Sequence, residues 1–140
     1  MVEYVLDSLE EAGVEQIILV IGYRAELVRE TLAHRSNLTF VEQTERLGTG
    51  HAVMVCREKI ADHTGPVLVV AGDCPMIQSS TIRALLKHFE EADLSCLLGS
   101  IHKDNPFGLG RIVRDDNGHF VDIVEQRDAT EEQRKITEVN

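Results

Sequence analysis

The stretch VLVVAGDCPM, residues 67–76, decides the fold class. Its apolar run ends abruptly at Gly72, and Asp73 and Pro75 follow at once. Such a run is typical of a buried strand in a parallel sheet. In open α/β sheets, ligands bind at the carboxyl ends of the strands. The stretch therefore predicts an α/β fold and puts Asp73 where a ligand would bind.

Two interpretations of Asp73 follow from its position at the end of this run. A carboxylate at a strand end can hold a divalent cation against a phosphate group. Alternatively, Asp73 only braces the turn that precedes Pro75. The segment by itself supports both interpretations equally, so the rest of the chain has to decide.

Strand patterns and helix patterns alternate along the first two thirds of the chain. Apolar runs predict strands over residues 16–22, 38–41, 67–71 and 94–100. Helical spacing of apolar residues predicts helices over residues 5–12, 25–33, 52–60 and 82–89. Alternating strands and helices indicate βαβ units and a mostly parallel sheet.

The last third has a different character. Residues 111–114 and 120–124 have strand patterns, and they flank an Asn-Gly pair at positions 117 and 118. Asn-Gly between two such runs predicts a β-hairpin. A short, highly charged helix is expected near residues 130–135. The length of 140 residues fits a single domain.

Composition excludes several classes of function. The formal net charge is −10, with acidic residues spread along the chain, and 43% of the residues are hydrophobic. This charge argues against nonspecific binding of nucleic acid or of an anionic membrane. No apolar run approaches the length of a bilayer span, and the first residues lack a signal-peptide pattern. We expect a cytoplasmic protein.

Glycine-rich segments form two further candidate sites. Gly48 and Gly50 straddle Thr49 at a strand-to-helix junction, where backbone N–H groups and the helix N-terminus can meet a ligand. Gly108 and Gly110 precede a strand and suit a loop over a site. Ordinary glycine turns explain both segments equally well.

Two single residues are open to a functional and a plain interpretation. Glu125 ends a strand and could accept hydrogen bonds from sugar hydroxyls, although a charge at a strand end is usually just solvated. His51 has no partner that the sequence reveals, so we interpret it as a helix-start residue rather than a catalytic base.

Taken in order, the motifs match one family. The chain resembles the uridyltransferase domain of bacterial N-acetylglucosamine-1-phosphate uridyltransferase, the bifunctional GlmU-type enzyme, over nearly its whole length. The resemblance is carried by Gln43 with Leu47-Gly48-Thr49-Gly50-His51-Ala52, by Gly72-Asp73-X-Pro75, by Gly108-X-Gly110-Arg111-Ile112, by Val124-Glu125-Gln126-X-Asp128-Ala129-Thr130-X-Glu132-Gln133, and by Glu138-Val139-Asn140.

The resemblance implies a Rossmann-like nucleotide-diphospho-sugar transferase fold and an activity. The family joins UTP to N-acetylglucosamine 1-phosphate with Mg²⁺, giving UDP-N-acetylglucosamine and pyrophosphate. The implied site residues fall into a uracil group, a nucleotide and metal group, and a sugar group. These are, respectively, Gln43, Gly48 and Thr49; Ala71, Gly72 and the Mg²⁺ ligand Asp73; and Gly110, Glu125 and Asn140.

The chain also departs from the family pattern. The family's first strand, phosphate-binding glycine loop and following lysine have no counterpart, and neither has its second metal ligand. Ala71 stands where the family often has tyrosine. We therefore interpret residues 1–140 as a partial domain, truncated at both ends relative to the family. We expect the isolated chain to be inactive or weakly active. Either a homo-oligomer or partner covers the incomplete sheet, or the chain is only marginally stable.

Two alternatives remain beside a sugar-1-phosphate uridyltransferase. One is another nucleotidyltransferase of the same fold, similar to molybdenum-cofactor guanylyltransferases, which Gly-Asp-Cys-Pro-Met at residues 72–76 resembles. The other is a non-catalytic interaction or regulatory module. The expected ligands are UTP with a sugar 1-phosphate, or UDP-N-acetylglucosamine, and no nucleic acid or membrane.

Overall fold

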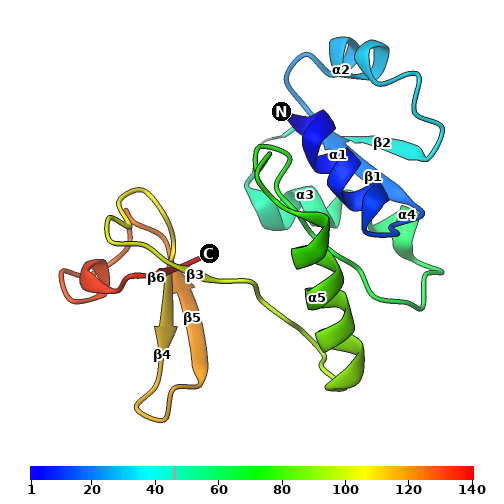
Figure 1. Ribbon diagram of the computed structural model, residues 1–140. Helices are drawn as coiled ribbons and strands as arrows, with labels where there is room; N and C mark the ends of the chain where they lie inside the picture. Colours follow the sequence, from blue (N-terminus) through cyan, green and yellow to red (C-terminus); the bar gives the residue numbers. More distant parts are fainter. Residues whose placement is uncertain (46) are drawn as a thin grey trace. The chain divides into compact units, whose positions relative to one another are not determined.

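A computed structural model describes residues 1–45 and 47–140 and divides the chain into two compact units, Met1–Lys87 and His88–Asn140. We call them the N-terminal unit and the C-terminal unit. Each unit has its own sheet, and helix α5 (Ser79–Glu91) begins in the first unit and ends in the second (Figure 1).

The N-terminal unit is a parallel α/β arrangement. Strands β1 (Ile17–Ile21) and β2 (Leu38–Glu42) pair in parallel, with Ile17 opposite Leu38 and Ile21 opposite Glu42. The connection between them contains α2 (Ala25–Thr31), so the two strands and this helix form a βαβ unit. The other helices of the unit are α1 (Val2–Glu11), α3 (Thr49–Met54), α4 (Arg57–Ile60) and the first part of α5.

A single apolar cluster holds the N-terminal unit together. Helix α1 is amphipathic, and its apolar residues face β1 and α5, as the arrangement of these elements in Figure 1 allows. Leu6, Leu32 and Ile82 are each at most 1% exposed. The cluster consists of Val5, Leu6, Leu9, Ile17, Leu32 and Ile82.

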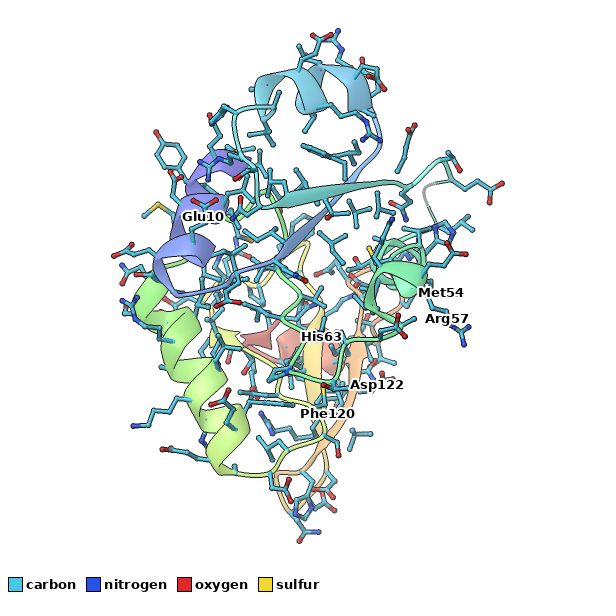
Figure 2. All side chains as sticks on the ribbon, turned by 90° about the vertical axis from the view of Figure 1, so that its right-hand side faces the viewer. Glu10, Met54, Arg57, His63, Phe120 and Asp122 are labelled. Atoms are coloured by element: carbon cyan, nitrogen blue, oxygen red, sulfur yellow. The ribbon has the colours of Figure 1, made fainter. Side chains whose placement is uncertain are left out.

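A polar clamp joins the opposite side of α1 to the turn before β2. The Arg35 guanidinium donates to Asp7 at 2.5 Å and to Glu10 at 3.0 Å, and the Asn37 amide also donates to Glu10 at 3.0 Å. Glu10 is labelled on α1 in Figure 2. The side chain of Arg35 is 12% exposed, and its hydrogen bond to Asp7 is the main cause that raises its pKa.

The prediction of a strand over residues 67–71 is wrong, because within the described chain this segment lacks the hydrogen bonds of a strand. Leu68 and Val70 pack against the apolar cluster, whereas Val67 and Val69 are 54% and 58% exposed. The side chains thus alternate as they do in a strand, but within the described chain no neighbouring strand pairs with this segment. A strand exists only through its ladder of backbone hydrogen bonds, and apolar sequence cannot replace that partner.

Three other expected elements differ from the prediction. The helix over residues 52–60 is divided into α3 and α4, which end at Met54 and begin again at Arg57. Of the apolar run that predicted a strand over residues 94–100, nothing is strand, and only the following β3 (Ile101–His102) pairs. The expected helix near residues 130–135 is the 3₁₀ turn η1 (Gln133–Lys135).

The C-terminal unit is an antiparallel sheet in the order β3-β6-β4-β5. The predicted hairpin is confirmed as β4 (Arg111–Arg114) and β5 (Phe120–Val124), and Phe120 and Asp122 are labelled on β5 in Figure 2. The last strand, β6 (Glu138–Val139), pairs with both β3 and β4. The α/β fold class is therefore confirmed. Within the described residues, no helix combines the length and apolarity needed to cross a bilayer.

Candidate functional site

Gln43 lies directly after β2, at the carboxyl end of the parallel strands. Its backbone N–H donates to the Ile21 carbonyl at 2.8 Å, which extends the pairing of β2 with β1 by one step. Its side-chain Nε2 donates to the Gly48 carbonyl at 3.1 Å. Within residues 1–45 and 47–140, no hydrogen bond reaches Gln43 Oε1, so this acceptor is available to a ligand.

Gly48 has a backbone conformation that only glycine adopts readily. Its φ of 96° and ψ of −177° lie in a region closed to residues with a Cβ. Gly48 caps α3, and Thr49 is the first, exposed residue of that helix. A Cβ at Gly48 would meet no atom within 4 Å, so the glycine is required by the backbone and leaves the space around it open.

His51 has a partner that the sequence did not reveal. Its Nδ1 lies 3.0 Å from Gln43 Nε2. Because an amide NH₂ group only donates, His51 Nδ1 is the acceptor and the ring proton lies on Nε2. His51 therefore orients the Gln43 amide. The interpretation of His51 as only a helix-start residue is incomplete, and nothing in the spacing of residues 43 and 51 indicated this contact.

Asp73 lies in an exposed turn after the extended run. The turn is closed by backbone, because the Cys74 N–H donates to the Ala71 carbonyl at 3.3 Å. In the described part of the chain, the Asp73 carboxylate receives only a long contact of 4.0 Å from the Cys74 thiol. Asp73 thus does not brace the turn through its side chain, and its oxygens face solvent.

An apolar groove lies beside the carboxyl end of β1 and next to Gly72. Its volume is about 260 Å³. Gly72 lies next to Val2, since a Cβ at residue 72 would make an ordinary contact of 3.6 Å with the Val2 side chain. The groove therefore brings residues 71–73 to the same end of the strands as Gln43. Its lining residues are Val2, Leu19, Val20, Ile21, Gly22, Val28 and Gly72.

A cation at Asp73 would depend on ligands from elsewhere. No group of three His, Cys, Asp or Glu side chains that could hold a metal occurs among the described residues. Mg²⁺, however, is commonly bound through one or two carboxylates together with substrate phosphates and water. An exposed carboxylate with unused oxygens fits that mode and does not fit a metal site made by protein alone.

In the C-terminal unit, three predicted site residues form one row across the sheet. Arg111 of β4 pairs with Val124 of β5 and with Val139 of β6. One step further along the same register, Gly110 comes between Glu125 and Asn140. The Asn140 N–H donates to the Gly110 carbonyl at 3.4 Å, as this register requires. Neighbours across a sheet share a face, so these three residues meet at one end of the sheet.

The side chains of Asn140 and Ile123 approach Gly110 closely. A Cβ at residue 110 would lie 2.6 Å from Asn140 Oδ1 and 3.0 Å from the Ile123 side chain. Gly110 is itself buried, whereas Glu125 and Asn140 are exposed. The row therefore presents a carboxylate and an amide to solvent on either side of a glycine.

The strand that carries Asn140 is fixed by a charged pair. Arg114 donates through Nε and Nη2 to Glu138 at 2.8 and 2.7 Å, and the Ser100 hydroxyl donates to Glu138 at 2.6 Å. These bonds, those from Arg114 first, lower the pKa of Glu138 to about 2. The two-pronged geometry ties β6 to β4 in the register that places Asn140 beside Gly110.

The predicted site residues thus form two clusters, one in each unit. The first cluster contains Gln43, Gly48, Thr49, Ala71, Gly72 and Asp73, and position 46 between its members lies outside the described residues. The second cluster contains Gly110, Glu125 and Asn140. Sequence reasoning gave His51 no role beside the first cluster, and it named Gln126 and Arg111, which lie next to the second cluster, only as parts of motifs.

Comparisons with known proteins identify the family of the chain. Residues 1–133 match the MobA-like NTP transferase domain. The whole chain is 42% identical over 140 residues to the bifunctional protein GlmU of Staphylococcus carnosus, and 44% identical over 141 residues to GlmU of Listeria monocytogenes serotype 4a. It spans 30% of the length of each of these relatives. The predicted resemblance to GlmU-type enzymes is confirmed.

Solved structures support the same fold. The chain is similar to HddC from Yersinia pseudotuberculosis, with a TM-score of 0.66 and 26% identity, over 89% of this chain and 55% of that one. A second structure of HddC, complexed with GMP-PN, matches with the same TM-score and coverage at 24% identity.

Proposed function

The chain belongs to the family of MobA-like NTP transferase domains, and we propose that it serves sugar-1-phosphate uridyltransfer. The proposed reaction joins UTP and N-acetylglucosamine 1-phosphate to give UDP-N-acetylglucosamine and pyrophosphate. The observation that supports it most is the row of Gly110, Glu125 and Asn140, because it gathers residues next to the ends of three strands in a chain that is similar to GlmU throughout.

In the proposed reaction the sugar-phosphate oxygen forms a bond to the α-phosphorus of UTP. The bond between the α-phosphorus and the bridging oxygen breaks, and pyrophosphate leaves with that electron pair. No proton has to move from carbon and no redox step occurs. Positioning of the two phosphates therefore accounts for most of the catalysis that protein side chains can supply.

The first cluster would bind the nucleotide. Gln43 Oε1 is free to accept the uracil imide N–H, while His51 and Gly48 hold the amide in that orientation. The open space around Gly48 admits a planar base. Asp73 would hold Mg²⁺ together with substrate phosphates, and the bound ion would stabilise the negative charge that develops on them.

The second cluster would bind the sugar. The Glu125 carboxylate accepts hydrogen bonds and suits sugar hydroxyls, whereas the Asn140 amide both donates and accepts. Gly110 keeps the space between them free of a side chain. This combination favours a neutral, hydroxyl-rich ligand over a charged one.

The test is isothermal titration of the full chain with UDP-N-acetylglucosamine, with and without Mg²⁺. We expect that Mg²⁺ strengthens the binding of UDP-N-acetylglucosamine and that Asp73→Asn loses this strengthening. Asp62→Asn, which changes another exposed aspartate of the N-terminal unit, is the control and keeps the wild-type response. Absence of binding at millimolar ligand, or an Mg²⁺ response that survives in Asp73→Asn, contradicts the proposal.

A second candidate is a guanine-nucleotide transferase. Two observations favour it: the matching family is named for MobA-like domains, and HddC was solved in complex with GMP-PN. Parallel titrations with UTP and GTP distinguish the candidates, since the uridyltransferase proposal expects the tighter binding for UTP. A chain that binds neither nucleotide, with or without Mg²⁺, would instead be a non-catalytic module.

A further inference from the structure

Arg111 is a buried cation whose hydrogen-bond acceptors among the described residues are all neutral. Its side chain is 1% exposed, the lowest exposure of any charged residue among those described. Its Nη1 donates to the Leu109 carbonyl and its Nη2 donates to Gln126 Oε1 at 2.6 Å. Nε is buried with no hydrogen-bond partner in the described chain. A charge buried among neutral acceptors is costly, so its place in the sheet calls for an explanation.

Gln126 is the second member of this network. Its Oε1 accepts from Arg111 and also from the Gly108 N–H, at 3.3 Å. One guanidinium and one amide oxygen therefore connect the loop at residues 108–109 with the segment that follows β5. Each bond crosses between segments that the hairpin brings together, because 15 residues separate Arg111 from Gln126.

The residues of this network lie next to the residues of the second cluster. Arg111 directly follows Gly110, and Gln126 directly follows Glu125. Arg111 also pairs with Val139, the neighbour of Asn140. A shift of the loop or of the end of β5 would thus separate Gly110 from Glu125. The guanidinium itself is covered by protein, so a ligand does not touch it.

We propose that Arg111 is a positioning residue, which acts with Gln126 to hold Gly110, Glu125 and Asn140 in the arrangement that binds the sugar. This inference rests on the proposed function for its ligand and on the hydrogen bonds of the network for its mechanism. The buried charge gives the two bonds more strength than neutral partners would have, which fixes a glycine-rich loop that is otherwise adaptable.

The first experiment needs no ligand. Amide hydrogen exchange, followed by NMR, reports on Gly108, whose N–H is bonded to Gln126 and not to Arg111. In Arg111→Met we expect this amide to exchange about tenfold faster, because Gln126 loses the partner that holds it. Arg127→Met is the control: it changes an arginine whose side chain is 85% exposed, and it leaves the exchange as in the wild type.

The second experiment compares UDP-N-acetylglucosamine with UDP, which lacks the sugar. Arg111→Met and Gln126→Leu are each expected to weaken the binding of the sugar nucleotide about tenfold and to leave the binding of UDP unchanged. Arg111→Lys recovers part of the loss, since it keeps one donor. The double variant loses no more than either single variant, because both remove the same network. If Arg111 and Gln126 contributed only to stability, their loss would weaken the binding of both ligands together.

The outcomes separate this inference from the proposed function. If the wild-type chain binds UDP-N-acetylglucosamine no better than UDP, the proposed sugar site is contradicted. The predicted effect of Arg111 on sugar-nucleotide binding is then contradicted as well. Normal sugar-nucleotide binding and normal Gly108 exchange in Arg111→Met contradict the positioning role alone. Should Arg111→Met fail to fold, Gln126→Leu decides by the same two measurements, since it removes no charge.

Discussion

Each of the two units of this chain is stabilised internally by a different force, and their candidate sites differ accordingly. The N-terminal unit buries an apolar cluster of six residues, whereas the C-terminal unit buries a guanidinium beside a few apolar side chains. The first cluster of site residues lies in short local segments that follow β2 and end the extended run at residues 67–71. The second is assembled by strand register from residues 110, 125 and 140. Apolar packing therefore supports the cluster proposed to bind the nucleotide, and a polar network supports the cluster proposed to bind the sugar.

The largest expected effect lies in the apolar cluster of the N-terminal unit. Leu6 is 1% exposed, so Leu6→Ala should lower the free energy of unfolding by about 2–5 kcal/mol, measured by urea denaturation. Leu27, which is 52% exposed on α2, is the matched control, and Leu27→Ala should cost less than about 1 kcal/mol. Equal losses in the two variants would contradict the apolar cluster as the basis of this unit.

The close approach at the second cluster predicts the next largest effect. Gly110→Ala places a Cβ 2.6 Å from Asn140 Oδ1, so it should destabilise the chain by about 1–3 kcal/mol and displace the Asn140 amide resonances in NMR spectra. Gly50→Ala is the control, because a Cβ there meets nothing within 4 Å. Unchanged Asn140 resonances in Gly110→Ala would show that the row packs more loosely than the distances indicate.

A smaller effect is expected from the polar clamp between α1 and the turn before β2, which supports the N-terminal unit by charge. Asp7→Ala removes one of two carboxylates from Arg35 and should cost about 0.2–1 kcal/mol, because Asp7 is 60% exposed. The loss should shrink in 1 M NaCl, where exposed charges are screened. A loss that does not depend on salt would mean that Asp7 acts through packing.

The smallest expected effect concerns the C-terminal unit and is measured as a dependence of stability on acid pH. The folded-state pKa of Glu138 is about 2, below its ordinary value of 4.5. The pair with Arg114 therefore stabilises the folded chain above pH 4.5, and this contribution is lost as the pH falls from 4.5 to 2. Urea unfolding measured across this range should show a weaker pH dependence in Glu138→Gln than in the wild type. Identical pH profiles would rule out this contribution.

Much of the fold could be predicted from the sequence. The apolar run at residues 17–21, the hairpin with its Asn-Gly turn and the amphipathic α1 each carry their own local signal. Residues 67–71 carry the signal of a strand as well, and the prediction was wrong there because pairing depends on a neighbour and not on the segment itself. The division of the helix over residues 52–60 into α3 and α4 likewise left no mark in the apolar spacing.

The candidate site divides in the same way. The sequence by itself determined which residue types could do chemistry: the carboxylate of Asp73 after an apolar run, the glycines at 48 and 110, and a family resemblance carried by motif order. Only the tertiary structure placed Gly110 between Glu125 and Asn140. It also brought His51 into hydrogen-bond contact with Gln43 and buried Arg111 against Gln126. The reason is physical, because local propensity depends on neighbours in the chain, whereas register and burial depend on partners far away in it.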